Sequence, residues 1–358
     1  MPSIDAFFDV MLQRKASDLH LAVGHPPTLR MRGELAGFRA REVDRNEIER
    51  VLLELLTPEQ RAELEAERDL DFAYAYEDKA RFRASYFYKK SHDPAVEREL
   101  GAVFRVIPTK VLSLEELGCP HAIKTLAERR SGLVLVTGPT GSGKSTTLAG
   151  MIRHINESRP CHILTIEDPV EFVHAPLKAV ITQREIGKHA PDFATAIKSA
   201  GREDADVILI GELRTNETMK LALQLASFGV LIFGTVHTNS APQTIDRILN
   251  AFPAEEQPMI RGLLATSLAG IVAQQLVPSA DDKSRCAAHE ILIGSNALSA
   301  MIREQKTFQI PSVMQSGQAV GMQTLDMALA RLVERGKVTA EAALEKATDK
   351  ESFTRMLK

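Results

Sequence analysis

The spacing of the hydrophobic positions changes along this chain, and the change divides it into regions. Residues 1–110 mix the periods that are typical of helices and of strands. Amphipathic patterns predict helices over residues 4–15, 47–56 and 58–68, the last with Thr57 as its N-cap. Alternating patterns predict strands over residues 18–23, 27–32, 71–76, 80–88 and 101–107. The charged stretch 89–98 is expected to form an exposed loop within this α+β region.

Residues 119–290 alternate short, wholly apolar segments with helical patterns. The apolar segments predict strands over residues 133–136, 162–166, 207–210 and 231–236. Strands that are apolar on both faces are typical of a parallel sheet covered by helices on both sides, so an α/β fold is expected. From residue 291 to 358 the pattern is helical, with helices predicted over residues 295–304, 324–334 and 339–347. Residues 111–118 are expected to link the first two regions.

A glycine-rich turn stands between the strand at 133–136 and a helical pattern at 147–155. Its residues are Gly138, Pro139, Thr140, Gly141, Ser142, Gly143, Lys144, Ser145 and Thr146. Strand, glycine-rich turn and helix start form the context that a phosphate-binding P-loop requires. Glycines let backbone N–H groups close around phosphate oxygens, and the helix N-terminus adds partial positive charge. Lys144 is expected to neutralise the phosphates of ATP, while the Ser145 hydroxyl ligates Mg²⁺.

Composition agrees with a soluble enzyme. Of the 358 residues, 44% are apolar and 25% are charged, which is ordinary for a globular protein with a buried core. The net charge is −3, so no overall basic balance points to nucleic acid or to an anionic membrane. The three cysteines lie far apart, which disfavours a metal cluster or a disulfide framework. Neither a signal-peptide pattern nor an apolar run of membrane-spanning length is seen, so we expect a cytoplasmic protein without direct membrane insertion.

Polar residues follow the other predicted core strands. Glu167 follows the second strand, Glu212 the third and His237 the fourth. The carboxyl ends of the strands form the ligand crevice of an open α/β sheet, so these groups are expected to converge on a γ-phosphate. Carboxylates there are suited to hold Mg²⁺ or to position a water molecule. Both Glu167 and Glu212 could serve as the general base, and the sequence leaves that choice open.

Three of these segments resemble motifs of one family, the type II/IV secretion and pilus ATPases. Residues 165–171 resemble its aspartate box, residues 206–214 its atypical Walker B strand, and residues 234–240 its histidine box. The likeness extends over nearly the whole chain, with further matching segments at residues 17–21, 102–108, 244–248, 288–294 and 321–327. The similarity is greatest to the pilus-retraction branch, whose members power twitching motility.

The resemblance implies a PAS-like N-terminal domain at residues 1–110 and a linker at 111–118. A RecA-like P-loop ATPase core would span residues 119–290, followed by a helical C-terminal region at 291–358. Members of the family form a homo-hexamer that hydrolyses ATP with Mg²⁺ at its subunit interfaces. The expected partner is the inner-membrane platform protein of the type IV pilus, and the expected location is the cytoplasmic side of the inner membrane at the pilus base. No nucleic-acid partner is expected.

The resemblance also implies roles for individual side chains. Arginines of the family's N-terminal domain that reach the nucleotide match three positions here: Arg81, Arg83 and Arg105. In the family's terms, Glu167 would position or deprotonate the attacking water, and His237 would sense the γ-phosphate. Glu212 would hold Mg²⁺ through water, beside Ser145.

Several positions depart from the family pattern. Val230 stands where the histidine box usually has its first histidine, and the helix at 297–304 lacks the usual Arg-Asn pair. These departures leave a weakly active regulatory ring paralogue open as an alternative to a retraction motor. A pilus extension or secretion ATPase is a second alternative, disfavoured because such proteins usually carry an extra N-terminal domain and a four-cysteine zinc module. A RecA-like nucleic-acid motor is a third, disfavoured by the acidic balance.

Overall fold

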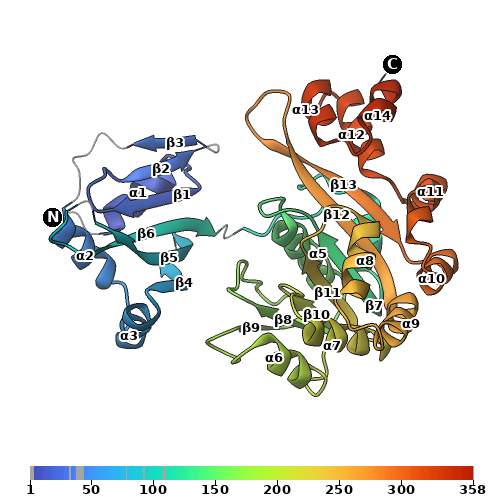
Figure 1. Ribbon diagram of the computed structural model, residues 1–358, viewed down its shortest axis with the longest axis horizontal. Helices are drawn as coiled ribbons and strands as arrows, with labels where there is room; N and C mark the ends of the chain where they lie inside the picture. Colours follow the sequence, from blue (N-terminus) through green and yellow to red (C-terminus); the bar gives the residue numbers. More distant parts are fainter. Residues whose placement is uncertain are drawn as a thin grey trace. The chain divides into compact units, whose positions relative to one another are not determined.

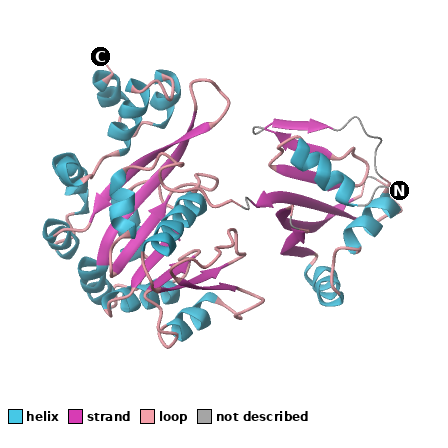
Figure 2. Ribbon diagram, turned by 180° about the vertical axis from the view of Figure 1, so that it is seen from behind, coloured by secondary structure: helices cyan, strands magenta, loops and turns pink. Residues whose placement is uncertain are grey.

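The chain divides into two compact units, Met1–Thr109 and Lys110–Lys358. Figures 1 and 2 show that each unit is a sheet with helices packed beside it. Among the residues that the structure describes, no helix is both long enough and apolar enough to cross a membrane. The computed structural model describes residues 4–31, 34–37, 44–77, 79–91, 93–107 and 110–357.

The N-terminal unit is built on a six-stranded antiparallel sheet in the order β3-β2-β1-β6-β5-β4. The predicted hairpin of β4 and β5 is present. The strands are β1 (Asp18–Ala22), β2 (Thr28–Met31), β3 (Glu34–Gly37), β4 (Asp69–Tyr76), β5 (Ala80–Lys90) and β6 (Arg98–Ile107). The helices are α1 (Ile4–Gln13), α2 (Arg45–Leu53) and α3 (Pro58–Glu67).

The predicted loop at residues 89–98 is wrong at both ends. β5 continues through Lys90 and β6 begins at Arg98, so these two residues pair across the hairpin. A cross-strand ion pair supports strand formation in so charged a segment: Lys89 Nζ lies 2.8 Å from Oε2 of Glu99, its partner in the ladder. The loop between the two strands is therefore shorter than the charge pattern suggested.

Alternation along β5 separates an aromatic core face from a polar face. Phe82 points into the core, where its ring stacks on Phe8 of α1 with the centroids 4.3 Å apart. Phe104 of β6 meets Phe8 edge-on at 5.0 Å. Such offset and edge-on aromatic contacts stabilise beyond the area that they bury. The residues on either side of Phe82, Arg81 and Arg83, therefore face away from this core.

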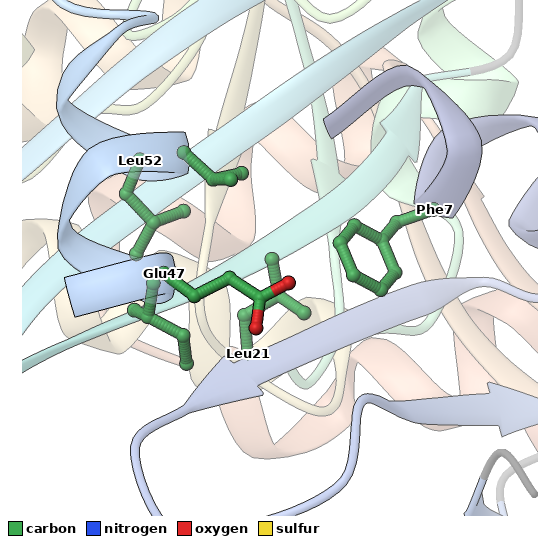
Figure 3. Close-up of a pocket in the computed structure, with 6 residues that line it drawn as sticks. Phe7, Leu21, Glu47 and Leu52 are labelled. Atoms are coloured by element: carbon green, nitrogen blue, oxygen red, sulfur yellow. The ribbon is translucent and has the colours of Figure 1, made fainter. Parts of the chain in front are cut away.

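A small pocket in this unit lies where α1 and α2 meet β1 (Figure 3). It is lined by Phe7, Leu21, Glu47, Ile48, Val51 and Leu52. Figure 3 shows the Glu47 side chain extending along the pocket toward Phe7. The lining is otherwise apolar, which suits packing between the helices and the sheet and offers little to a phosphate.

The C-terminal unit has a seven-stranded sheet in the order β13-β12-β7-β11-β10-β8-β9. Its central strands β7, β10 and β11 are buried at every position, as expected for strands covered on both faces. The four strands predicted from the apolar runs lie parallel, as expected, in the order β7-β11-β10-β8. At one edge of the sheet β13, which was not predicted, runs antiparallel to β12. Only residues 279–284 join these two strands, too few for the crossover that a parallel pair needs. The strands are β7 (Gly132–Thr137), β8 (His162–Glu167), β9 (Val180–Glu185), β10 (Val207–Ile210), β11 (Leu231–Val236), β12 (Leu268–Pro278) and β13 (Arg285–Ile293).

The helices of this unit fall into a group that covers the sheet and a group near the chain's end. The first group is α4 (His121–Ala127), α5 (Lys144–Ser158), α6 (Phe193–Ala200), α7 (Asn216–Ser227), α8 (Ala241–Asn250) and α9 (Gln257–Ser267). The second is α10 (Asn296–Arg303), η1 (Thr307–Gln309), α11 (Ile310–Ser316), η2 (Gly317–Val320), α12 (Leu325–Glu334), α13 (Ala340–Lys346) and α14 (Lys350–Met356). Helices α12 to α14 gather beside the β12–β13 hairpin (Figure 1), where Val277 and Ala288 join Leu329 and Phe353 in a separate apolar cluster.

Candidate functional site

The glycine-rich turn joins the end of β7 to the start of α5, as the sequence predicts. Gly138, Gly141 and Gly143 have φ angles of 145°, 77° and 86°, values that residues with a Cβ rarely adopt. Gly143 is the N-cap of α5, and Lys144 is its first residue. The backbone N–H groups of this first turn are among those that a helix leaves without internal partners.

Lys144 is buried within the turn, with its ammonium held by the turn's own carbonyls. Its Nζ donates to the backbone oxygens of Gly138 at 2.9 Å and Pro139 at 3.1 Å. Burial lowers the pKa of Lys144, and the carboxylates of Glu212 and Glu171 oppose that shift. The lysine is thus a cation in a partly desolvated setting, where its attraction to an anion is stronger than in water.

A pocket opens beside the first turns of α5, where Ser145 and Thr146 follow Lys144. Three strands reach it at their carboxyl ends: β8 with Glu167, β10 with the Gly211 that follows it, and β11 with Thr235. This is the edge of the sheet at which the sequence places the ligand crevice. The full lining is Ser145, Leu148, Ala149, Glu167, Phe172, His174, Leu209, Gly211 and Thr235.

Glu167, the last residue of β8, faces this pocket beside a neutral partner. Nε2 of Gln183 on β9 lies 3.4 Å from Glu167 Oε1 and donates at 2.8 Å to the Phe172 carbonyl. Burial raises the pKa of Glu167, and the negative charge of Glu171 adds to the rise while hydrogen bonds oppose it. A carboxylate with a raised pKa accepts a proton more readily near neutral pH.

Glu212 follows β10 and contacts a histidine that follows the adjacent parallel strand β11. Its Oε1 lies 3.2 Å from Nε2 of His237, and its Oε2 lies 2.8 Å from Nη2 of Arg214. Glu212 also acts on Lys144, whose pKa it raises against burial. The structure therefore brings Lys144, Glu212 and His237 together at one edge of the sheet, with Arg214 as an addition that the sequence did not single out.

Two buried hydroxyls at the turn have no hydrogen-bond partner within the described part of the chain. They are Thr137 Oγ1, at the end of β7, and Ser142 Oγ. Buried polar atoms are seldom left unpaired, so such hydroxyls are suited to phosphate oxygens or water. Thr140 lies at the exposed tip of the same turn. These groups fit the phosphates of ATP, and the oxygens of Ser145 and Glu212 are ligands of the kind that Mg²⁺ prefers.

The arginines singled out in the N-terminal unit lie on one face of its sheet. Arg83 stands directly opposite Arg105 in the β5–β6 ladder, and Arg81 is two residues from Arg83 on the same face. Arg105 Nε lies 2.7 Å from Oδ1 of the buried Asp18, and Arg83 Nη2 lies 2.7 Å from Oδ2 of Asp71. Two of the three arginines therefore have a carboxylate partner inside their own unit.

Val230, which replaces a family histidine, lies at the opposite end of β11 from His237. Its carbonyl accepts from the backbone N–H of Gly132 at the start of β7, at 3.1 Å, and its side chain packs against the core. The six residues of β11 separate it from His237, which is about 20 Å of extended chain. The Val230 substitution therefore leaves the P-loop edge of this chain's own sheet unchanged.

Sequence reasoning missed three residues at this edge: His174, Gln183 and Gln274. His174 lines the pocket, and burial lowers its pKa to about 4. Its position three residues after Glu171, the last residue of the aspartate-box segment, was the available signal. Gln183 and Gln274 lie inside strands where no motif marks them, and only their contacts reveal them.

Curated proteins resemble the chain over nearly its whole length. The Pseudomonas aeruginosa protein named "Type IV pilus retractation ATPase PilT" is 45% identical over 338 residues, covering 94% of this chain and 96% of that protein. A "Twitching motility protein" of Neisseria gonorrhoeae is 47% identical over 328 residues, covering 92% and 86%. The "Type IV pilus ATPase PilU" of P. aeruginosa is 35% identical over 349 residues, covering 98% and 90%.

A solved structure described as "Crystal Structure of the Pilus Retraction Motor PilT and Bound ADP" has the same fold. It matches with a TM-score of 0.89 at 37% identity and covers 99% of this chain and 100% of its own. The family described as "Type II/IV secretion system protein" matches residues 2–354. These findings confirm the resemblance that the motifs carry, and the chain therefore belongs to the type II/IV secretion system protein family.

Proposed function

We propose that this chain is an ATP hydrolase that powers type IV pilus retraction and twitching motility. The observation that carries the proposal is that the lysine of the P-loop interacts with an acidic residue that follows one core strand, and that this residue contacts a histidine that follows the adjacent strand. Lys144 lies in the turn and interacts with Glu212, which contacts His237. Relatives named for pilus retraction and twitching at 45% and 47% identity, and an ADP-bound retraction motor of the same fold, support it.

The turn from Gly138 to Thr146 binds the phosphates of ATP in this proposal. Lys144 would exchange its carbonyl partners for the β- and γ-phosphate oxygens, because these oxygens carry net negative charge and attract an ammonium more strongly than neutral carbonyls do. The unpaired hydroxyls of Thr137 and Ser142 lie where further oxygens could accept from them. When bound, Mg²⁺ neutralises part of the phosphate charge. Ser145 would supply one ligand, and Glu212 would hold the ion through a water molecule.

Glu167 is the better candidate for the residue that takes a proton from the attacking water. Its pKa is raised by burial, and its hydrogen-bond partner Gln183 is neutral. Glu212 instead has the guanidinium of Arg214 and the imidazole of His237 beside it, so both of its oxygens already have partners. In this proposal Glu212 serves the metal, and His237, which contacts Glu212, senses the γ-phosphate.

The assembly in this proposal is a homo-hexamer with ATP at the junctions between subunits. Residues 1–110 act as a PAS-like domain, 119–290 as a RecA-like core, and 291–358 as a helical region that follows it. Arg81, Arg83 and Arg105 of one subunit reach the nucleotide of its neighbour, where guanidinium groups would stabilise the charge that develops on the γ-phosphate. Hydrolysis then releases this contact and lets the domains reorient.

The partner in this proposal is the inner-membrane platform protein of the type IV pilus. The ring would act on it from the cytoplasmic side of the inner membrane, at the pilus base. Retraction is favoured over extension because the relatives named for retraction align with nearly the full chain, whereas the type II secretion E proteins align with less than half of it. The choice of retraction over extension thus rests on the names of the relatives that align with nearly the full chain.

Steady-state ATPase measurements on the purified chain test the proposal, with Lys144→Ala as the inactive control. A wild-type rate no higher than that of the control would identify a regulatory ring. Deletion of the gene, scored by surface motility and pilus number, tests the role in the cell. Excess unretracted pili are expected, and missing pili would instead assign extension.

A further inference from the structure

We propose that Gln274 is a positioning residue that sets the shape of the phosphate-binding turn. Gln274 lies on β12, and its side-chain amide connects Ser142 in the turn to Thr147 in helix α5, which follows the turn. Its Nε2 donates to the Ser142 carbonyl at 2.6 Å, and its Oε1 accepts from the Thr147 hydroxyl at 2.7 Å. Only 2% of Gln274 is exposed, so both bonds form away from water.

The two contacts fix the orientation of the amide. The Ser142 carbonyl can only accept, so the NH₂ end of Gln274 must face it. The opposite orientation would place two oxygens against each other at that distance. Thr147 then donates its hydroxyl proton to Oε1. A single side chain that both donates and accepts is needed here, and glutamine provides it.

The Ser142 contact determines where a backbone donor points. In a planar trans peptide the C=O of one residue and the N–H of the next point in opposite directions. Because Gln274 holds the Ser142 carbonyl toward β12, the N–H of Gly143 points away from β12. Backbone N–H groups of such a turn are the donors that surround a phosphate. Gln274 therefore orients one of these donors without touching the nucleotide itself.

Close packing makes this contact stiff. A Cβ at Gly138 would lie 2.3 Å from the backbone oxygen of Gln274, and a Cβ at Gly143 would lie 2.9 Å from its Nε2. Both glycines are thus needed for the turn to approach β12 this closely. The turn has little room to move against Gln274, so a change in that side chain is transmitted to the turn.

Two ionisable groups face this position from neighbouring elements. His289 on β13 is the ladder partner of Gln274, and burial lowers its pKa to about 4. Lys144 donates to the Gly138 carbonyl in the turn itself. At neutral pH the imidazole is uncharged, so a carboxylate at position 274 would find an oxygen of Ser142 in front of it and gain no positive charge from His289.

The inference rests on the proposed binding of nucleotide to this turn, and the test separates the two. ADP binding to the full-length protein is measured by calorimetry for wild type, Gln274→Glu, Gln274→Met and Gln275→Glu. Gln275 is the adjacent residue of β12 and points to the other face of the sheet, so Gln275→Glu is the matched control. Circular dichroism and thermal melting report whether each variant folds.

We expect Gln274→Glu to bind ADP at least about tenfold more weakly than wild type at about pH 8, with Gln275→Glu within about threefold. Near pH 5.5 the buried glutamic acid regains a proton and can donate again, so part of the lost affinity of Gln274→Glu should return. Wild type, Gln274→Met and Gln275→Glu should not show this recovery. If Gln274 only supported the fold, the loss of ADP affinity would not be reversed at the lower pH.

Two results would overturn the inference while leaving nucleotide binding intact. One is wild-type affinity in Gln274→Glu or Gln274→Met at about pH 8. The other is a loss in Gln274→Glu that is the same at both pH values. If Gln274→Glu does not fold, the test uses Gln274→Met and Thr147→Val, the second of which removes the hydroxyl that donates to Gln274. Weaker ADP binding by both variants would support the inference, and wild-type affinity in both would overturn it. Failure of wild type itself to bind ADP would instead refute the proposed function.

Discussion

Oε1 of Glu212 lies 3.2 Å from Nε2 of His237. This contact connects the segments that follow β10 and β11, two adjacent parallel strands. The second oxygen of the same carboxylate lies 2.8 Å from Nη2 of Arg214. Glu212 also acts electrostatically on Lys144 in the turn. One carboxylate thus serves as the anion for several cationic or ionisable groups. A phosphate arriving at the turn would compete with Glu212 for them, which links phosphate binding to the positions of β10 and β11.

Lys144→Ala should abolish ATP turnover. No neutral side chain can replace the ammonium that the turn holds through the Gly138 and Pro139 carbonyls. Lys198→Ala is a suitable control, since that lysine is exposed and pairs with Glu217 on the surface of α7. Steady-state ATPase assays check the prediction, and a Lys144→Ala variant with a normal rate would refute the assignment.

Glu167→Gln and Glu212→Gln should both slow hydrolysis, but in different ways. Loss of a general base typically costs about 10²- to 10⁴-fold in kcat, so Glu167→Gln should lower kcat while the Mg²⁺ requirement stays unchanged. Glu212→Gln should raise the Mg²⁺ concentration needed for half-maximal rate. Titration of Mg²⁺ at saturating ATP distinguishes the two variants, with the exposed Glu255→Gln as control. A shifted Mg²⁺ requirement in Glu167→Gln alone would exchange the two roles.

Arg81→Ala should slow hydrolysis with little effect on folding or nucleotide affinity. Arg105→Ala is expected to slow hydrolysis and also to destabilise the fold, because it leaves the buried carboxylate of Asp18 without its 2.7 Å partner. That loss should reduce the free energy of unfolding by about 1–2 kcal/mol. Urea denaturation and ATPase assays on both variants separate the two effects. Equal destabilisation by Arg81→Ala would make that arginine structural as well.

Local signals along the sequence predicted much of the fold. The apolar runs of β7, β8, β10 and β11 were found because a strand buried on both faces is apolar throughout. Thr57 caps α3 as predicted, accepting from the backbone N–H of Gln60 at 3.2 Å. The glycine-rich turn was found because its φ angles and its position before a helix require that composition.

Contacts between distant segments were not predictable from such signals. The antiparallel edge of the sheet depends on the short connection between β12 and β13, whereas the apolar pattern of β12 fits either direction. Gln274 and Ser142 are 132 positions apart, and a lone glutamine in a strand resembles a solvated residue. The ion pair between Lys89 and Glu99, within the charged segment that forms strand, likewise joins partners that only the hairpin brings together.

His289→Phe should reduce the pH dependence of stability on the acid side. Burial lowers the pKa of His289 and of His174 to about 4, against 6.5 for the free side chain. The unfolded chain therefore binds more protons than the folded chain between those values, so stability is full above about pH 6.5 and falls as the pH drops toward 4. Each histidine contributes up to about 1.4 kcal/mol per pH unit in that window. Nε2 of His289 has no partner among the described residues, so phenylalanine at this position leaves no new unpaired group there.

The measurement is urea denaturation at several pH values between about 4.5 and 7.5. The chain has no tryptophan, so unfolding is followed by far-UV circular dichroism. His289→Phe should lose part of the wild-type slope and keep the part due to His174, whereas the exposed His121→Gln serves as a control for removal of an imidazole. An unchanged slope in His289→Phe would mean that His289 has the same pKa in the folded and the unfolded chain. The β12–β13 edge would then accommodate a charged imidazole beside Gln274 at acidic pH.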